Sequence, residues 1–157
     1  MVIEVFGDDI TKEDVKDLIP RVGARGIVKK DNLYLMVYFE KDGFYTLPGG
    51  GVEINESLEA AVIREVKEET GYICQIMKKG VVLKEYFIDS VWHNHYYLLD
   101  VVDQTEVALT KEEKDMGLVP VWKTLEEVLD ILSSSDSDHQ DAEAIHNREF
   151  LGFTHSL

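Results

Sequence analysis

Apolar and polar residues alternate along several stretches of the chain with the two-residue period of a half-buried β-strand. Polar pairs that are typical of tight turns, Asp31-Asn32 and Asp89-Ser90, separate neighbouring stretches. The turns and the alternation together indicate hairpins within one sheet. The strands that this pattern predicts are residues 2–6, 22–29, 33–39, 45–47, 73–88, 91–102 and 118–122.

Other stretches carry apolar residues at the spacing of an amphipathic helix. Gly71 follows the first of them at the position of a left-handed C-terminal cap. Thr124-Leu-Glu-Glu127 is a capping box, which is typical of a helix start. The polar residues 133–138 indicate a loop between the last two helices. The predicted helices are residues 56–70, 125–132 and 138–151.

Strands that surround two or three amphipathic helices predict a layered α/β or α+β domain. The length of 157 residues, of which 45% are hydrophobic, suits one domain with one core. We therefore expect a single domain over residues 1–157. Residues 1–19 would form an N-terminal extension, and residues 138–151 would form a C-terminal helix packed on the domain.

The formal net charge of −15 limits the classes of partner. A surface this acidic repels nucleic acid duplexes and anionic membranes, which attract basic proteins. The chain contains no apolar run near the ~20 residues of a membrane span. It begins without the basic and apolar regions of a secretory signal, and Cys74 is its only cysteine. These features favour a cytoplasmic protein whose phosphate-bearing ligands need local basic residues or a bound cation.

The first predicted helix gathers carboxylates at its C-terminal end, where the helix dipole is already negative. At about 100° per residue, Glu65 and Glu69 fall within the apolar stripe of Leu58, Ala61 and Val62, and Glu68 lies about 60° to one side. The stripe of such a helix should face the sheet. An acidic surface face would lie on the opposite side, so the pattern indicates carboxylates that point toward the protein.

A divalent cation would offset the repulsion between these carboxylates. Mg²⁺ takes oxygen ligands and commonly joins one or two carboxylates to substrate phosphates, and Mn²⁺ accepts the same ligands. Arg64 precedes Glu68 by one helical turn and is placed to orient it. Before the helix, the run 47–51 (LPGGG) lacks bulky side chains after its first two residues, which lets backbone approach a ligand.

These residues together resemble the Nudix box, the sequence G-x5-E-x7-R-E-U-x-E-E-x-G-U, in which U is bulky and apolar. Gly50, Glu56 and residues 64–72 (REVKEETGY) match every fixed position in spacing and identity. The one departure is Tyr72, which is aromatic where an aliphatic residue is usual. The preceding LPGG and a later strand that ends in Trp122 extend the likeness to about residues 20–151.

The resemblance implies a Nudix-type α/β/α sandwich with a mixed β-sheet and a loop–helix–loop motif. It also implies metal-dependent hydrolysis of a diphosphate linkage in a nucleoside diphosphate derivative: a nucleotide sugar, ADP-ribose, a dinucleotide polyphosphate or a (d)NTP. The implied cofactor is Mg²⁺, with Mn²⁺ as an alternative. By motif position the metal ligands would be Glu65, Glu68, Glu69 and the Gly50 carbonyl.

The remaining roles are also implied by motif position. Arg64 would orient a ligand carboxylate, whereas Glu56 and Gly71 would support the loop–helix–loop. Glu68 and Glu69 are candidates for the base that accepts the proton of the attacking water. Some family members use a glutamate from the loop before the later Trp-bearing strand, and Glu112 and Glu113 occupy that loop here.

Substrate contacts are expected from the strands beside the motif. Arg25 is a candidate for binding a phosphate or a base, although it also suits an exposed position. Tyr45 suits stacking on a base or packing in the core, and Gly49 and Gly50 would let backbone approach the substrate. Residues 37–41 lack the arginine that many triphosphate-cleaving relatives carry there, which favours a diphosphate derivative.

Two other classes of function fit part of the sequence. A nucleotide-sensing module with the Nudix fold would bind without turnover, but such domains usually lose glutamates of the box. A structural domain that binds divalent ions would not need the open glycine backbone beside the carboxylates. The leading hypothesis is therefore a hydrolase that acts on a small-molecule nucleotide as a monomer or a homodimer.

Overall fold

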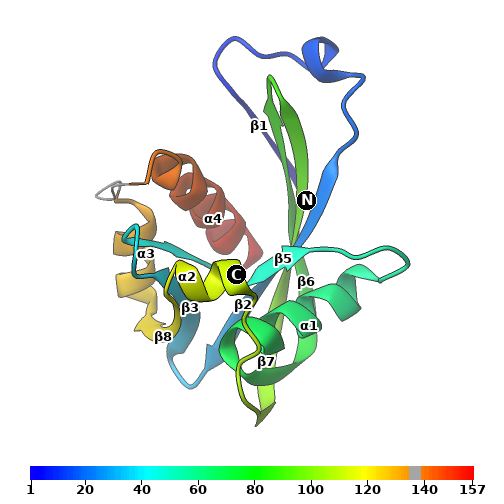
Figure 1. The fold of residues 1–157 in the computed structure, drawn as a ribbon. Helices are drawn as coiled ribbons and strands as arrows, with labels where there is room; N and C mark the ends of the chain where they lie inside the picture. The colour runs from blue at the N-terminus through cyan, green and yellow to red at the C-terminus, as the bar shows by residue number, and fades with distance from the viewer. Residues whose placement is uncertain (135–138) are drawn as a thin grey trace.

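The structure, a computed structural model, describes residues 1–134 and 139–157 (Figure 1). Its strands are β1 (Val2–Phe6), β2 (Arg21–Lys30), β3 (Leu33–Phe39), β4 (Phe44–Thr46), β5 (Gly49–Gly51), β6 (Tyr72–Phe87), β7 (Ser90–Gln104) and β8 (Leu118–Thr124). Its helices are the 3-10 turn η1 (Glu13–Val15), α1 (Leu58–Thr70), α2 (Lys111–Asp115), α3 (Leu125–Leu132) and α4 (Ala142–Ser156). Within the described residues, no helix is long and apolar enough to cross a membrane.

One mixed sheet forms the middle of the molecule. Six strands follow one another in the order β1-β6-β7-β2-β3-β4, while β5 pairs with β2 and β8 pairs with β3. The pairs β1–β6 and β2–β7 are parallel, and the others are antiparallel. The predicted α/β fold with a mixed sheet is confirmed.

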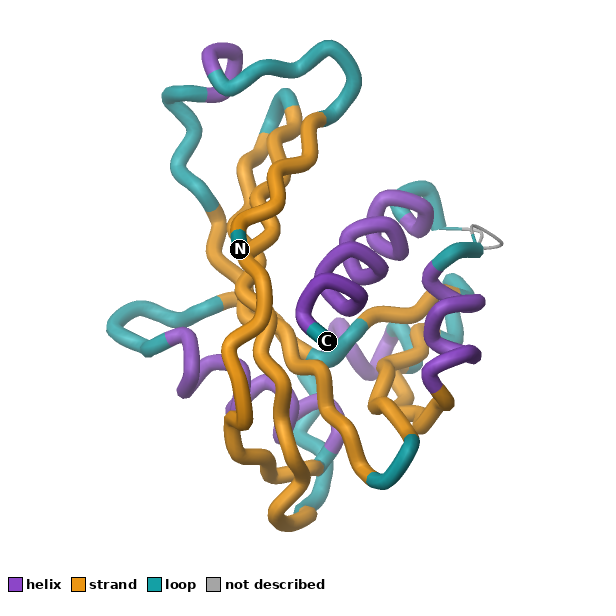
Figure 2. Tube along the Cα trace, turned by 180° about the vertical axis from the view of Figure 1, so that it is seen from behind, coloured by secondary structure: helices purple, strands orange, loops and turns teal. Residues whose placement is uncertain are grey.

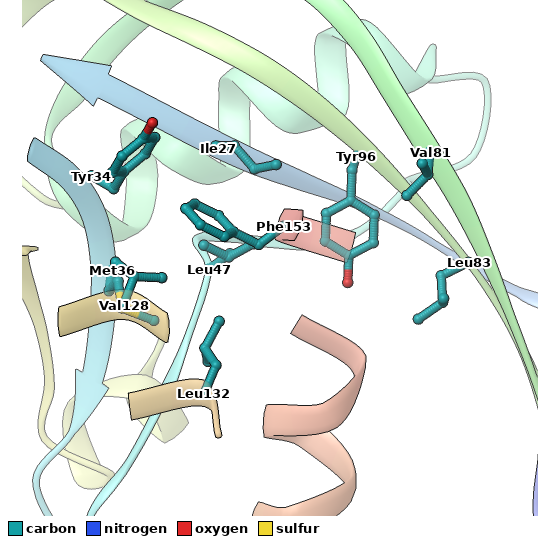
Figure 3. Close-up of a cluster of buried hydrophobic side chains, with 10 residues drawn as sticks. All are labelled: Ile27, Tyr34, Met36, Leu47, Val81, Leu83, Tyr96, Val128, Leu132 and Phe153. Atoms are coloured by element: carbon teal, nitrogen blue, oxygen red, sulfur yellow. The ribbon is translucent and has the colours of Figure 1, made fainter. Parts of the chain in front are cut away.

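Helices cover both faces of this sheet, with α1 on one side and α3 and α4 on the other (Figures 1 and 2). The α1 side buries Ala61, Val62 and Val66 against strand residues such as Val28 and Leu99. On the α4 side, Phe153 and Val128 pack with Ile27, Leu47 and Tyr96 (Figure 3). The sheet therefore has an apolar core on each face, which is the three-layer arrangement that the resemblance implies.

The β6–β7 hairpin extends beyond the helices, and β1 lies along it (Figure 2). The parallel pairing runs from Val2 opposite Val82 to Phe6 opposite Tyr86, and the rings of Phe6 and Tyr86 stack with 4.7 Å between centroids. Residues of the predicted N-terminal extension thus add an edge strand to the sheet before the chain enters β2.

Most predicted elements appear within two residues of their expected bounds. Gly71 adopts the predicted left-handed conformation, with φ of 77°, and its N–H donates to the Lys67 carbonyl. The capping box at Thr124 is present, and Cys74 is buried as a small apolar residue. The first predicted helix begins later, at Leu58, because Ser57 accepts a hydrogen bond from the Ala60 N–H as its N-cap.

One strand was missed and two expectations were wrong. The glycine run, for which no strand was predicted, forms β5, where Gly49 to Gly51 pair with β2. Residues 112 and 113 lie in the short helix α2 and not in a loop. The last helix continues past residue 151 to Ser156, because Phe153 and Ser156 are buried against the sheet. Its predicted start at residue 138, and the predicted loop over 135–138, lie outside the described residues.

Candidate active site

The last two turns of α1 bring together three glutamates, Glu65, Glu68 and Glu69, which we call the acidic cluster. The exposed fraction of the side chain is 16% for Glu65 and 40% for Glu68, while Glu69 as a whole is 4% exposed. Glu69 lies in the middle of the apolar stripe and Glu68 at its edge, as their helical angles require. The cluster therefore faces the protein at one end and solvent at the other.

Arg64 is the cation at the centre of this cluster. Its Nη1 donates to Glu65 at 2.9 Å and to Glu68 at 3.2 Å. Its Nε and Nη2 donate to the two carboxylate oxygens of Glu56 at 2.7 and 2.9 Å, and Nη2 also reaches the Gly51 carbonyl at 3.1 Å. One guanidinium thus connects the loop before α1, the strand β5 and two cluster carboxylates.

The contact with Arg64 fixes the charge of Glu56. A bidentate hydrogen bond to a guanidinium favours the ionised carboxylate. The pKa of Glu56 is lowered to about 2, first by the Arg64 side chain and then by the Glu53 N–H. The predicted supporting role of Glu56, by charge pairing, agrees with this geometry.

Glu65 lies against the backbone of β5. A Cβ atom added to Gly50 would come within 2.6 Å of the Glu65 carboxylate carbon and 2.7 and 2.8 Å of its oxygens. Only glycine leaves room for a carboxylate at this position. Burial raises the pKa of Glu65, although Arg64 acts in the opposite direction.

Glu69 is hydrogen-bonded to the other end of the glycine run. Its Oε1 accepts from the Gly49 N–H at 2.7 Å. Burial raises its pKa well above the ordinary value, and the negative charges of Glu65 and Glu113 raise it further, which outweighs the Gly49 N–H. A buried carboxylate with like-charged neighbours gains free energy from a cation.

Two further acids were expected near the cluster, and the structure distinguishes them. Glu113 is half-buried and lies close enough to raise the pKa of both Glu65 and Glu69. Its carboxylate accepts from the Thr110 N–H at 2.9 Å, within a capping box that opens α2. Glu112 is exposed on the same short helix. The motif Thr110-x-x-Glu113 is the sequence signal that could have predicted this helix.

The chemistry of these groups fits a hard divalent cation. The acidic cluster offers carboxylate oxygens, and the Gly50 carbonyl belongs to the backbone that Glu65 contacts. Within residues 1–134 and 139–157, no three acidic, histidine or cysteine side chains already converge as a ready-made metal site. In this conformation Arg64 and the Gly49 N–H occupy carboxylate oxygens that a metal would need.

Two predicted substrate residues lie on the α4 face of the sheet. Arg25 is not an exposed charge: its Nε is 3.5 Å from Asn94 Oδ1 and 4.0 Å from Glu149 Oε1. In the sheet register it stands opposite Gly49. Tyr45 is half-buried, packs on Tyr38 with 4.6 Å between ring centroids and borders the core of α3 and α4. The geometry of Tyr45 agrees with the core-packing alternative.

Glu149 is a buried acid for which the sequence patterns indicated no role. Its side chain is fully buried on α4, and its Oε2 accepts from the N–H of Leu47, two residues before Gly49, at 2.6 Å. Its Oε1 accepts from Tyr96 Oη at 3.0 Å and from Arg148 Nε at 2.9 Å. A charged residue within the apolar positions of the last predicted helix was the available signal.

Curated relatives match part of the chain. An ADP-ribose pyrophosphatase of Methanocaldococcus jannaschii is 43% identical over 74 residues, which cover 43% of this chain and 44% of that protein. A putative ADP-ribose pyrophosphatase of Bacillus subtilis, YjhB, is 37% identical over 76 residues, which cover 48% of this chain and 34% of that protein. The chain therefore spans less than half the length of these two relatives.

Solved structures match the fold over most of its length. A NUDIX hydrolase from Nitrosomonas europaea superposes with a TM-score of 0.64 at 18% identity, over 85% of this chain and 90% of that one. A MutT protein from Methanosarcina mazei gives a TM-score of 0.61 at 19% identity, over 88% and 95%. The model of the NUDIX domain matches residues 19–147, which contain the whole acidic cluster. With that match over most of its length, this chain belongs to the Nudix family.

Proposed function

We propose that this chain is a divalent-metal-dependent pyrophosphohydrolase that cleaves the diphosphate linkage of a nucleoside diphosphate derivative. The observation that carries the proposal is the acidic cluster itself, held between Arg64 and the backbone of Gly49 and Gly50. Relatives that are named as ADP-ribose pyrophosphatases support the same reaction class. The whole chain, 1–157, would act as one domain, since β1 and α4 both pack on the one sheet.

Glu65, Glu68, Glu69 and the Gly50 carbonyl would hold Mg²⁺ or Mn²⁺. A bound ion would supply positive charge that stabilises the anionic phosphoryl group and the leaving phosphate in the transition state. Arg64 would position the carboxylates of Glu65 and Glu68 through the hydrogen bonds that it already makes. Arg25, opposite Gly49, would bind substrate from the other face of the sheet.

A carboxylate must accept the proton of the water that attacks the phosphorus. Glu68 is the most exposed member of the acidic cluster, so bulk water reaches it most easily. Glu69 and Glu113 are the alternatives, and both lie in the same negative surroundings. Glu112, which is exposed on α2, is the least favoured of the four.

The experiment is a hydrolysis assay with Mg²⁺ and a panel of ADP-ribose, nucleotide sugars, dinucleotide polyphosphates and (d)NTPs. The wild-type protein should release phosphate-containing products from at least one class. Glu68→Gln and Glu69→Gln should each lose nearly all turnover, whereas Glu126→Gln, an exposed residue of α3, should keep it. Full rates in both cluster variants would exclude the site. Tight binding of a nucleotide without turnover would favour the sensing module.

A further inference from the structure

A cavity lies on the α4 face of the sheet, away from the acidic cluster. It has a volume of about 440 Å³ and lies between the far part of the β6–β7 hairpin and the first turns of α4. Figure 1 shows the hairpin and α4 beside each other. Glu85, Phe87 and Trp92 line it from the hairpin, and Ile145 and Arg148 line it from α4. Two exposed acids, Asp89 and Asp141, lie at its edge. Pockets of this size hold small-molecule ligands in proteins.

Arg148 offers unused hydrogen-bond donors to this cavity. Its side chain is 14% exposed, and its Nε donates to Glu149 at 2.9 Å. Within the described part of the chain, its two terminal nitrogens have no hydrogen-bond partner. A guanidinium held by one edge presents its other edge as a rigid donor fork, which matches two adjacent acceptors on a planar ligand.

Glu85 offers a hydrogen-bond acceptor to the same cavity. The residue is 6% exposed, and its Oε1 accepts from Asn94 Nδ2 at 3.1 Å. Its Oε2 has no hydrogen-bond partner among residues 1–134 and 139–157, although burial raises the pKa of this carboxylate and the charge of Arg148 lies near enough to act in the opposite direction. Asn94 itself is fully buried, so its hydrogen bond fixes the Glu85 carboxylate on the side away from the cavity. The cavity therefore combines a donor fork and a carboxylate with the rings of Phe87 and Trp92, on which a planar group can stack.

Among nucleobases, guanine alone has edges that match this combination. Its O6 and N7 are two adjacent acceptors, and an arginine fork is their commonest protein partner. Its N1–H and 2-amino group are two adjacent donors, which suit a carboxylate. Adenine has a single exocyclic amino donor beside N7 and lacks the second acceptor. We propose that this cavity binds the guanine base of the substrate, an inference that rests on the proposed function. Arg148 would donate to O6 and N7, and Glu85 would accept from N1–H and the 2-amino group.

The paired strands β7, β2 and β5 connect the wall of the cavity to the acidic cluster. Asn94 stands beside Gly23 in the register, and a Cβ on Gly23 would lie 2.7 Å from Asn94 Oδ1. Gly23 in turn pairs with Gly51 of β5, the strand that contacts Glu65 from its other face. Arg25 links the two regions, because its Nε points to Asn94 and its backbone pairs with Gly49. A base in the cavity would thus direct its diphosphate toward β5.

Equilibrium binding of nucleoside monophosphates tests the base contacts without any turnover. GMP and IMP differ only in the 2-amino group, so calorimetry on the wild-type protein should show about ten-fold tighter binding of GMP. In Glu85→Gln the free oxygen can be replaced by an amide donor, and the GMP-to-IMP ratio should fall to near one. Glu126→Gln should keep the wild-type ratio. Equal affinities in the wild-type protein, no measurable GMP binding, or an unchanged ratio in Glu85→Gln would overturn the proposal.

The contact of Arg148 is tested through the ligand, because this side chain is paired with the fully buried Glu149 and its substitution endangers the fold. 7-Deaza-GMP lacks the N7 acceptor and should bind the wild-type protein several-fold more weakly than GMP. Binding equal to that of GMP would overturn the assignment of Arg148.

Hydrolysis separates this inference from the proposed function. The wild-type kcat/KM should be about ten-fold higher for a GDP-sugar than for the matching ADP- and UDP-sugars. Hydrolysis of all three at equal kcat/KM would overturn guanine recognition while the proposed function stands. A ten-fold preference for GMP binding without hydrolysis of any diphosphate would support the cavity and contradict the proposed function.

Discussion

At the scale of single residues, the site depends on which atoms can approach the acidic cluster. Arg64 supplies the cation that holds Glu65 and Glu68 in place, and glycine at position 50 leaves the space that the Glu65 carboxylate fills. The backbone of Gly50 lies outside the left-handed region, so it accepts an alanine without strain of its own. A methyl group there would first meet the Glu65 carboxylate.

Gly50→Ala should therefore impair metal binding more than stability. The added Cβ must displace the Glu65 carboxylate, which is the movable end of a side chain, so the urea midpoint should change little. Loss of a well-placed ligand group should weaken Mn²⁺ binding roughly ten-fold or more. Gly51→Ala is the matched control for both measurements, since its Cβ would meet no atom within 4 Å. Equal Mn²⁺ affinity in the two variants would contradict this role of Gly50.

At the scale of elements, the segment 45–49, which leads into the glycine run, is hydrogen-bonded to helices on both faces of the sheet. Three alternate backbone N–H groups each donate to a side chain of a covering helix, two to α4 and one to α1. These hydrogen bonds are Tyr45 N–H to His146 Nε2 at 3.1 Å, Leu47 N–H to Glu149 Oε2 at 2.6 Å and Gly49 N–H to Glu69 Oε1 at 2.7 Å. The position of β5 thus depends on α4, which contributes no residue to the acidic cluster.

The variant Glu149→Gln tests the dependence of β5 on α4 through the free energy of unfolding. Breaking one partner of a buried charge pair leaves Arg148 uncompensated, so the free energy of unfolding at pH 7 should fall by about 3 kcal/mol or more. Chemical denaturation measures the change. Asn147→Ala, an exposed neighbour on α4, is the control and should change stability little. Equal stability of Glu149→Gln and the wild-type protein would contradict the dependence of β5 on α4.

The pH dependence of that difference follows from the pKa of Glu149. Burial alone would raise this pKa, but Arg148, Arg25 and the Leu47 N–H outweigh burial and lower it below 4.5. A lowered folded pKa gives stability that is present above the unfolded value and is lost as pH falls through the folded value. The stability advantage of the wild-type protein over Glu149→Gln should therefore shrink below about pH 4.5. A constant advantage down to pH 3 would contradict this charge state.

The elements also show where sequence patterns fail. The helical wheel located the acidic cluster because Glu65 and Glu69 share angles with Ala61 and Val62, an intrahelical property. It could not show that Glu69 reaches the Gly49 N–H, because that contact joins segments 20 residues apart. The strand β5 has three glycines and no alternation, and only its pairing with β2 makes it a strand. The five residues of α2 are too few for periodicity, so the segment was predicted as a loop and only its capping box could have indicated a helix.

At the scale of the whole molecule, an acidic protein is proposed to bind an anionic substrate. The chain has 31 acidic residues and 16 lysines and arginines, and its net charge is −15. Arg25, Arg64 and Arg148 are all largely buried and paired with acids, so they act locally and leave the outer surface negative. Repulsion at long range should slow the approach of a nucleotide.

Ionic strength should therefore raise the second-order rate. An increase from 0.01 M to 0.1 M NaCl shortens the Debye length from about 30 Å to about 10 Å. At a fixed, saturating Mg²⁺ concentration, kcat/KM should rise a few-fold over this range because the repulsion is screened. Steady-state assays at several NaCl concentrations measure the effect. A falling kcat/KM would instead indicate that a positive surface attracts the substrate.

The most direct test of the central claim, that the acidic cluster binds a divalent cation, is a Mn²⁺ titration followed by electron paramagnetic resonance. The wild-type protein and the control Glu126→Gln should show the same tightest site. In Glu65→Gln/Glu69→Gln this site should be lost or at least ten-fold weaker, while the weak sites of the acidic surface remain. Unchanged affinity and stoichiometry in the double variant would show that the acidic cluster does not bind the metal.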